Sequence, residues 1–283
     1  MMPSSHNPPM LLEDTLWLLT SRTNIAIYDF DFQHCFHTRS PLHPIGNISA
    51  VARVGAPANY QGFYDECLAG GIALINSPEE HMRASRLDAW YPLLEDLTPR
   101  SVCFRERPTL EQVKAKFIWP VFMKGVRQTN RHQRKLSIIE SDADFISAME
   151  MYAHDPILGW QDVVCREFVS LRPLADTGLN QSRIPRSYEF RTFWWKGELV
   201  GAGRYWWEGP GYHWRPDEQA AALAIAGEAA RRANVPFLVV DVAQTAVGNW
   251  IVIECNDGQE SGYAGVSPFE LWQKILDHEK ALL

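Results

Sequence analysis

Three residues near the C-terminal end of the sequence have side chains that could bind a metal ion. Asp241 lies in the apolar segment Val239-Val240-Asp241-Val242, and Glu254 and Asn256 lie two residues apart in Ile253-Glu254-Cys255-Asn256. Two carboxylates and an amide supply hard oxygen donors, which suit Mg²⁺, or Mn²⁺ in its place, because Mg²⁺ takes few protein ligands and completes its octahedron with water and substrate phosphates. The pattern therefore predicts a metal site that also holds phosphate groups.

The elements expected around these residues would bring them together. The segments 237–242 and 250–255 have the apolar composition of buried strands. Residues two apart on a strand share a face and lie about 6.6 Å apart, so Glu254 and Asn256 can reach one ligand, and a neighbouring strand would add Asp241. The alternative is that both acids are only the polar-facing members of half-buried strands. Facing carboxylates repel each other on apolar strands, however, which favours a bound cation.

Cationic side chains occur on strands predicted earlier in the chain. Arg191 lies in a strand over 188–195, and Arg204 lies in its hairpin partner over 199–207. An arginine that emerges from a sheet is a suitable fork for a phosphate or a carboxylate. A cation–π contact or a salt bridge is the alternative for both arginines.

Composition and charge exclude several classes of protein. The chain has 283 residues, of which 46% are hydrophobic, and this indicates a globular protein and not a disordered or fibrous one. A formal net charge of -7 argues against a nucleic-acid partner, because such partners are usually bound by basic surfaces. No apolar run approaches the roughly 18 residues of a membrane span. The five scattered cysteines favour free thiols in a reducing compartment, so we predict a soluble, cytoplasmic protein without a membrane partner.

The order of these motifs resembles the ATP-grasp superfamily. A lysine on a strand is followed by a basic loop, a hinge strand, an arginine on a hairpin and finally Asp and Glu-x-Asn, over residues from about 100 to the end. In that family a lysine in a Pro-Val-x-x-Lys strand contacts the nucleotide phosphates, and Pro120-Val121-Phe122-Met123-Lys124 is similar. The thirteen-residue step from Asp241 to Glu254, with Asn256 two residues on, is similar to the family's metal-binding pattern. The resemblance implies that ATP and Mg²⁺ are bound.

The loop after this lysine departs from the family pattern. The family has a glycine-rich loop that closes over the β- and γ-phosphates, whereas residues 127–135 contain no glycine and are rich in arginine and lysine. Backbone amides wrap a phosphate less freely without glycine, so cationic side chains are expected to supply the contacts, with Lys135 the expected phosphate ligand. The alternative is a solvated, charged hairpin tip.

The resemblance implies further roles for single residues. A strand predicted over 163–171 resembles the hinge strand that holds adenine, which implies that Glu167, Phe168 and Val169 contact the nucleotide. Its exposed N–H and C=O groups can pair with the base. Glu167 could equally be an ordinary surface acid.

The catalytic and substrate-binding roles also follow from the resemblance. Lys124 and Arg191 are the expected catalytic residues, because both would offset charge on the transferred phosphoryl group. Arg191 would hold the γ-phosphate or an acyl phosphate, and Arg204 and Asn256 would lie near the substrate.

The predicted elements place the chain in the mixed α/β (α+β) class. The resemblance implies an ATP-grasp fold, in which two α+β subdomains grip ATP, preceded by a smaller N-terminal α/β lobe. We expect a flexible tail over 1–10, the lobe over 11–99 and the ATP-grasp domain over 100–283, with a central nucleotide-binding subdomain at about 100–170 and a C-terminal metal-binding subdomain at 171–283. Local patterns also predict one helix over 78–94 and strands over 16–28, 117–126 and 136–140.

These inferences predict an ATP-dependent carboxylate–amine ligase that forms an amide or peptide bond through an acylphosphate. Small carboxylates and amines, amino acids and peptides among them, are the expected substrates, and the sequence leaves the oligomeric state open. One alternative is a phosphotransferase with a hydroxyl acceptor, because an ATP site does not choose the acceptor. The other is a nucleotide-binding module without turnover, which the glycine-free loop suggests and the intact Asp, Glu and Asn set argues against.

Overall fold

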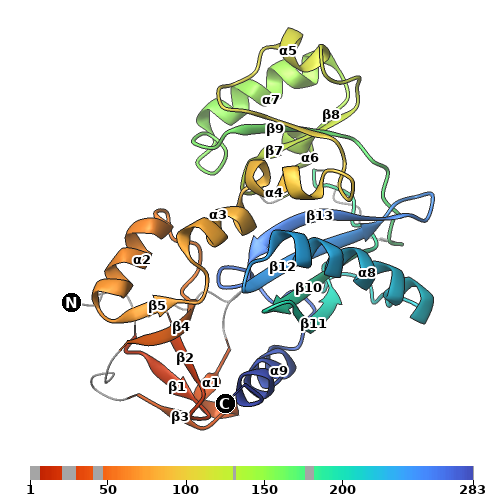
Figure 1. The fold of residues 1–283 in the computed structure, drawn as a ribbon. Helices are drawn as coiled ribbons and strands as arrows, with labels where there is room; N and C mark the ends of the chain where they lie inside the picture. Colours follow the sequence, from red (N-terminus) through yellow and green to blue (C-terminus); the bar gives the residue numbers. More distant parts are fainter. Residues whose placement is uncertain (1–6, 21–29, 41–46, 130–131, 176–181, 283) are drawn as a thin grey trace.

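The protein is described by a computed structural model that covers residues 7–20, 30–40, 47–129, 132–175 and 182–282. Its strands in these ranges form three sheets, one with five strands and two with four. Figure 1 shows the N-terminal sheet at the lower left, one four-stranded sheet at the top and the other between them. The expected mixture of α and β structure is confirmed.

The N-terminal lobe is built on the five-stranded sheet, of order β3-β1-β2-β4-β5. Its strands are β1 (Met10–Leu12), β2 (Leu16–Thr20), β3 (Thr38–Arg39), β4 (Ile48–Arg53) and β5 (Ile72–Leu74). Its helices are α1 (Phe32–Cys35), α2 (Tyr60–Ala69) and α3 (Pro78–Ser85). Met10 starts β1, and the backbone N–H of Asn7 donates to the carbonyl of Thr20 (3.0 Å), so the expected tail over 1–10 does not extend through residues 7–10. The predicted strand over 16–28 ends at Thr20, and residues 21–29 lie outside the described ranges.

The helix predicted over 78–94 is two helices. Ser77 and Glu80 form a capping box at the start of α3, with Pro78 in the first turn, as the local pattern favours. Arg86 then adopts an extended backbone and separates α3 from α4 (Leu87–Leu94). The N–H of Leu87 donates to the carbonyl of Val126 (3.0 Å) instead of continuing one helix. The prediction was wrong because this tertiary contact outweighs helix propensity.

The upper sheet has the order β6-β9-β7-β8. Its strands are β6 (Ser101–Phe104), β7 (Val121–Gly125), β8 (Ile138–Ile139) and β9 (Val163–Glu167), and its helices are α5 (Leu110–Lys114), α6 (Arg134–Ser137) and α7 (Asp142–His154). The strands predicted over 117–126 and 163–171 are both shorter in the structure. The strand predicted over 136–140 is wrong in its first part, where α6 forms and buries Leu136.

The lower four-stranded sheet carries the acidic residues. It has the order β11-β10-β12-β13, and its strands are β10 (Glu189–Trp195), β11 (Glu198–Arg204), β12 (Phe237–Gln244) and β13 (Trp250–Asp257). Helix α8 (Pro216–Ala233) packs its alanines on one face, against Val240 and Val242. Helix α9 (Pro268–Lys280) packs on the other face, against Val239. Among the described residues, no helix is both long and apolar enough to cross a membrane.

Candidate active site

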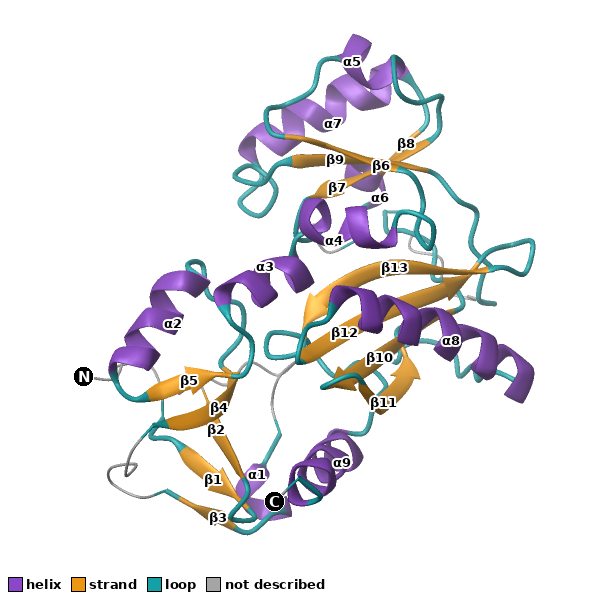
Figure 2. Cartoon of the chain, in the orientation of Figure 1, coloured by secondary structure: helices purple, strands orange, loops and turns teal. Residues whose placement is uncertain are grey.

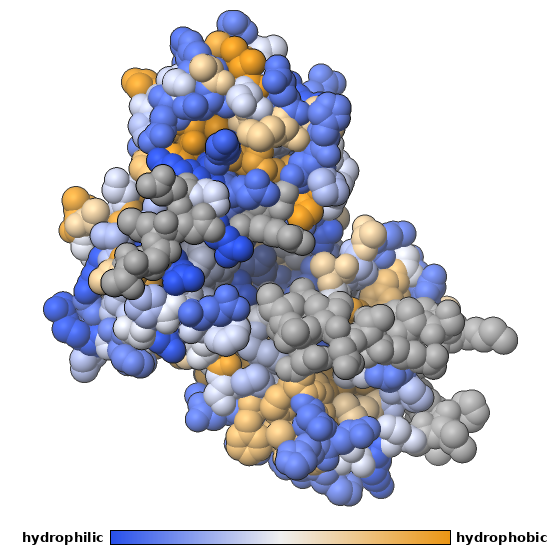
Figure 3. Space-filling view, turned by 180° about the vertical axis from the view of Figure 1, so that it is seen from behind, coloured by the Kyte–Doolittle hydropathy of each residue, from blue (hydrophilic) through white to orange (hydrophobic). Residues whose placement is uncertain are grey.

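A cavity of about 280 Å³ lies between the upper sheet and the lower four-stranded sheet. Phe122, Phe168 and Ile251 line its apolar part, and Lys124 and Glu254 line its charged part. Figure 3 shows the molecule from behind, with hydrophobic residues gathered on the upper subdomain that forms the roof of this region. A mostly apolar cavity with a few charged groups is typical of a small-molecule site.

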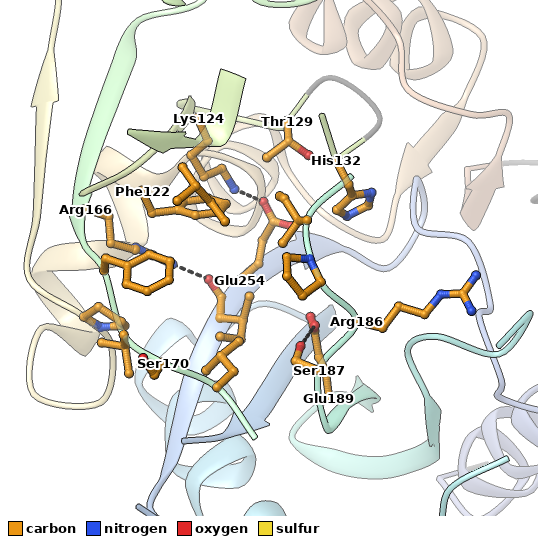
Figure 4. Close-up of a pocket in the computed structure, with 18 of the residues that line it drawn as sticks. Phe122, Lys124, Thr129, His132, Arg166, Ser170, Arg186, Ser187, Glu189 and Glu254 are labelled. Atoms are coloured by element: carbon orange, nitrogen blue, oxygen red, sulfur yellow. Dashed lines mark hydrogen bonds and ion pairs between the residues drawn. The ribbon is translucent and has the colours of Figure 1, made fainter. Parts of the chain in front are cut away.

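Lys124 and Glu254 meet inside the cavity, and Figure 4 shows their side chains pointing toward each other. Lys124 comes from β7 and Glu254 from β13, and the Lys124 ammonium donates to Glu254 Oε1. Burial raises the pKa of the Glu254 carboxyl, but the positive charges of Lys124 and Arg191 outweigh burial, so this pKa lies below its ordinary value. The carboxylate is therefore ionised at neutral pH.

Arg191 and Asp241 form a second ion pair on neighbouring strands of the lower sheet. The Arg191 guanidinium donates from Nε to Asp241 Oδ1 (2.8 Å) and from Nη2 to Oδ2 (2.7 Å), which is the bidentate geometry of a strong pair. Its Nη1 donates to the carbonyl of Gly262 (2.8 Å). Burial would lower the pKa of Arg191, and the Asp241 carboxylate outweighs burial and raises it. Arg191 therefore carries a permanent charge in a buried position.

The three predicted metal ligands lie close together in the sheet. Asp241 and Glu254 are directly opposite each other on β12 and β13, and Asn256 follows two residues along the same strand. Cross-strand neighbours have Cβ atoms about 5 Å apart, so both carboxylates can face one ion. This donor set fits Mg²⁺ by its chemistry. Both carboxylates are engaged by Lys124 and Arg191, so metal binding requires these cations to turn toward another anion, as a nucleotide phosphate would allow.

The predicted adenine contacts line the cavity. Glu167, Phe168 and Val169 follow one another where β9 ends. The N–H of Glu167 already donates to the carbonyl of Arg100 (2.8 Å), and its side chain is exposed, so Phe168 and Val169 are better placed for a base. The shorter strand leaves their backbone outside the sheet ladder, which is what pairing with a ligand requires.

Two predicted residues lie away from the cavity. Lys135 is exposed on α6 and does not line it, whereas Thr129, His132 and Arg134 from the same loop do. Arg204 does not line it either, and its guanidinium lies 5.9 Å from the ring centre of Tyr212. Residues 130 and 131 of the predicted phosphate loop lie outside the described ranges.

Sequence patterns missed several residues that the structure places in the cavity wall. Arg166 is buried, burial lowers its pKa to about 10, and its Nη2 has no hydrogen-bond partner in the described chain. Glu189 is also buried, and burial together with Asp241 raises its pKa to about 8. An unpaired buried guanidinium nitrogen fits a cavity that receives an anion. The isolated charge of Arg166 within the apolar run of β9 was the signal in the sequence.

Tyr205 and His132 were missed as well. The Tyr205 hydroxyl lies 3.2 Å from His132 Nε2, and the Arg191 guanidinium lies 5.1 Å from the Tyr205 ring centre. Burial lowers the pKa of His132, so this imidazole is neutral near pH 7. The pair links the loop after β7 to the arginine of the lower sheet.

Comparison with protein families identifies the fold that carries this site. A family model described as an ATP-grasp domain, the third family of its clade, matches residues 100–275. The chain belongs to this family. The ATP-grasp fold expected from the motifs is therefore confirmed, and a comparison with curated proteins found no match.

Solved structures agree on the ATP-grasp fold. A RimK domain protein ATP-grasp from Sphaerobacter thermophilus has a TM-score of 0.55 and 16% identity, covering 85% of this chain and 82% of that one. The VanG D-Ala:D-Ser ligase from Enterococcus faecalis has a TM-score of 0.56 and 14% identity, with 83% and 72% covered. The D-alanine–D-alanine ligase from Bacillus anthracis complexed with ATP has a TM-score of 0.54 and 13% identity, with 82% and 78% covered.

Proposed function

We propose that the protein is an ATP-dependent carboxylate–amine ligase that forms an amide or peptide bond through an acylphosphate. The observation that carries this proposal is the cross-strand pair Asp241–Glu254, in which each carboxylate is held by a cation from another strand, Lys124 or Arg191. Metal-binding and phosphate-binding groups thus share one end of the cavity. Membership of the ATP-grasp family and the likeness of its fold to two amino-acid ligases support the proposal.

The cavity has separate places for the parts of ATP. We propose that Phe168 and Val169 hold the adenine, since they lie in the apolar part with Phe122. The phosphates then extend toward Lys124 and Arg166, which supply positive charge without glycine-loop amides. Lys135 and Arg204 lie outside the cavity and have no part in this mechanism.

Asp241, Glu254 and Asn256 would hold Mg²⁺, which when bound neutralises charge on the phosphate oxygens. The substrate carboxylate attacks the γ-phosphorus, the bond to ADP breaks, and an acylphosphate forms. The amine nitrogen then attacks the carbonyl carbon, a C–N bond forms, the C–O bond breaks, and phosphate and a proton are released. Lys124 and Arg191 stabilise the negative charge that develops in both steps.

The surroundings of the cavity protect such an intermediate from water. Tyr205 and Trp206 form an aromatic wall, and His132 contacts both rings. Excluding water prevents hydrolysis of an acylphosphate before the amine attacks. The five cysteines are free thiols, which supports the cytoplasm as the proposed compartment.

Trapping with hydroxylamine tests the ligase reaction without a known amine. The full chain is incubated with Mg²⁺, ATP, hydroxylamine and a mixture of amino acids and short carboxylic acids. We expect ADP, free phosphate and an acyl hydroxamate in equal amounts, and Glu254→Gln should lower the rate about a hundredfold or more. Glu198→Gln, an exposed acid on β11, is the matched control and should leave the rate unchanged.

The products separate this function from its rivals. A phosphorylated hydroxyl compound without hydroxamate would identify a phosphotransferase. Stabilisation by Mg²⁺ and ATP without any turnover would identify a binding module, since a ligand at one hundred times its Kd stabilises the folded state by about 2.7 kcal/mol. An unchanged rate in Glu254→Gln would remove Glu254 from the mechanism.

A further inference from the structure

A second group of polar side chains lies at the boundary between the N-terminal lobe and the lower sheet. It consists of Arg127 from the turn after β7, His81 from α3 and Glu260 from the loop after β13, and we call it the boundary cluster. Figure 2 shows α3 beside the C-terminal end of β13. None of the three residues lines the cavity described above. The mechanism proposed so far therefore leaves this cluster without a role.

The boundary cluster lies next to the proposed phosphoryl-transfer centre. Strand β13 carries Glu254 and ends at Asp257, three residues farther on. A strand advances about 3.3 Å per residue, so the loop that bears Glu260 begins about 10 Å beyond Glu254. Arg127 likewise follows Lys124 by three residues. The two chain segments that supply the catalytic pair thus supply this cluster at their next positions.

His81 is held in one orientation and one tautomer. Its Nδ1 lies 2.9 Å from Asp257 Oδ2, and its Nε2 lies 3.1 Å from Arg127 Nη2. A guanidinium group can only donate, so Nε2 accepts and Nδ1 carries the proton. The Tyr60 ring stacks on the imidazole with centres 3.8 Å apart. His81 is therefore neutral and positions Arg127 without adding a competing positive charge.

Glu260 is a buried carboxylate with too few partners. Its Oε2 lies 3.4 Å from Arg127 Nη2, and its Oε1 lies 3.7 Å from His81 Nε2, which has no proton to donate. Charge-assisted hydrogen bonds are usually about 2.8 Å long, and Oε1 has no hydrogen-bond partner in the described chain. Burial, and then the Asp257 carboxylate, raise the pKa of Glu260 to about 8. A bound cation would supply the missing contact.

Arg127 offers the opposite charge beside it. Its side-chain hydrogen bonds to the described residues all start from Nη2, which leaves Nε and Nη1 as donors for a ligand. A guanidinium with donors to spare is a preferred partner of a carboxylate. Arg127 Nη2 and Glu260 Oε2 are 3.4 Å apart, so the two charges can bind neighbouring groups of one molecule.

We propose that Arg127 and Glu260 bind an α-amino acid that supplies the amine in the ligase reaction, with Arg127 on its α-carboxylate and Glu260 on its α-ammonium group. The inference rests on the proposed function, because it names the class of amine substrate. An α-amino acid fits because its two opposite charges are attached to one carbon atom. An amine without a carboxylate would leave the guanidinium donors unmatched.

Calorimetric titration of single amino acids into the full chain, with Mg²⁺ and the ATP analogue AMPPNP present, tests this proposal. The probes are the common L-α-amino acids and the D forms of the small ones. We expect at least one to bind, and its N-acetyl and carboxamide derivatives, which each lack one charge, to bind about tenfold more weakly or worse. Glu260→Gln and Arg127→Met should weaken amino-acid binding to the same extent and leave the Kd of AMPPNP unchanged.

A matched control and the contrary outcomes complete the experiment. Glu66→Gln on the exposed side of α2 should bind the amino acid as the wild-type chain does. Unchanged AMPPNP binding shows that each variant is folded. If the chain binds AMPPNP but no amino acid, or if the variants or the derivatives bind equally well, the proposal is overturned and the proposed function stands. If the wild-type chain does not bind AMPPNP, the proposed function fails and this inference fails with it.

Discussion

Lys124 and Arg191 each neutralise one carboxylate that would otherwise be buried without a counter-charge. Removing one partner of such a pair leaves an uncompensated buried charge, which destabilises a protein by about 3–5 kcal/mol. The pairs Lys124–Glu254 and Arg191–Asp241 are therefore best probed by substitutions that keep the shape of the side chain, such as Glu254→Gln. A loss of activity then reports on chemistry and not on folding.

Glu189 gives a prediction on pH dependence. Its folded-state pKa is raised to about 8, above the unfolded value near 4.5, so between these values the folded state binds a proton that the unfolded state does not. Stability contributed by this proton is present at low pH and is lost as pH rises through this window. We expect Glu189→Gln to have a melting temperature that falls less than that of the wild type between about pH 5 and pH 8. Parallel thermal curves for both proteins across that range would contradict the prediction.

At the scale of an element, the turn after β7 explains how a loop without glycine in residues 127–135 can work. The Oε1 atom of Gln161 accepts from the N–H groups of Arg127 (2.9 Å) and Gln128 (3.2 Å). These amides are therefore satisfied by a side chain and are not offered to phosphate. A Cβ atom on Gly125 would lie 2.3 Å from the same Oε1, so glycine is required just before the turn. The turn directs Arg127 toward His81.

The turn gives a prediction on stability. Gln161→Ala removes the acceptor of two backbone N–H groups in a half-buried turn, and we expect it to lower the free energy of unfolding by about 2 kcal/mol. It should also weaken any amino acid that Arg127 binds, because the turn places that side chain. Urea unfolding measures the first effect, with Gln219→Ala on the exposed side of α8 as the control, expected within about 0.5 kcal/mol of wild type. Equal stability of the two variants would show that the turn does not need Gln161.

At the scale of the whole molecule, the N-terminal lobe and the lower sheet share one core. Phe32 of the lobe, Trp272 of α9 and Phe237 of β12 are buried in the same cluster. The Phe32 and Trp272 ring centres are 5.2 Å apart, and the Trp272 indole N–H donates to the Tyr263 hydroxyl (2.8 Å). Tyr263 belongs to the segment that follows Glu260. The lobe is therefore part of the structure that positions the boundary cluster.

Trp272 tests this shared core. Trp272→Ala should destabilise the protein by about 3–5 kcal/mol, because it removes a fully buried ring between the two parts. Trp160→Ala is the matched control, since the Trp160 ring is 62% exposed, and its effect should stay within about 0.5 kcal/mol. Urea unfolding followed by circular dichroism measures both. Similar midpoints for the two variants would mean that the lobe and the sheet do not depend on each other.

Local patterns predicted elements where propensity and burial agreed. The capping box at Ser77 and the alanine-rich helix over 216–233 were confirmed because their signals lie within a few neighbouring residues. The helix expected over 78–94 and the strand expected over 136–140 were wrong. In the first case Leu87 pairs with Val126, and in the second case Leu136 turns into the core of α6, both of which depend on residues distant in sequence.

The same distinction applies to the site. The sequence alone determined the family and the facing acids Asp241 and Glu254, because strand period and apolar flanks are local properties. Only the tertiary structure placed Arg166 and Glu189 in the cavity and brought His81 to Asp257, 176 positions away. Contacts between residues so far apart depend on how whole sheets and helices pack, and no repeating pattern along the chain encodes that packing.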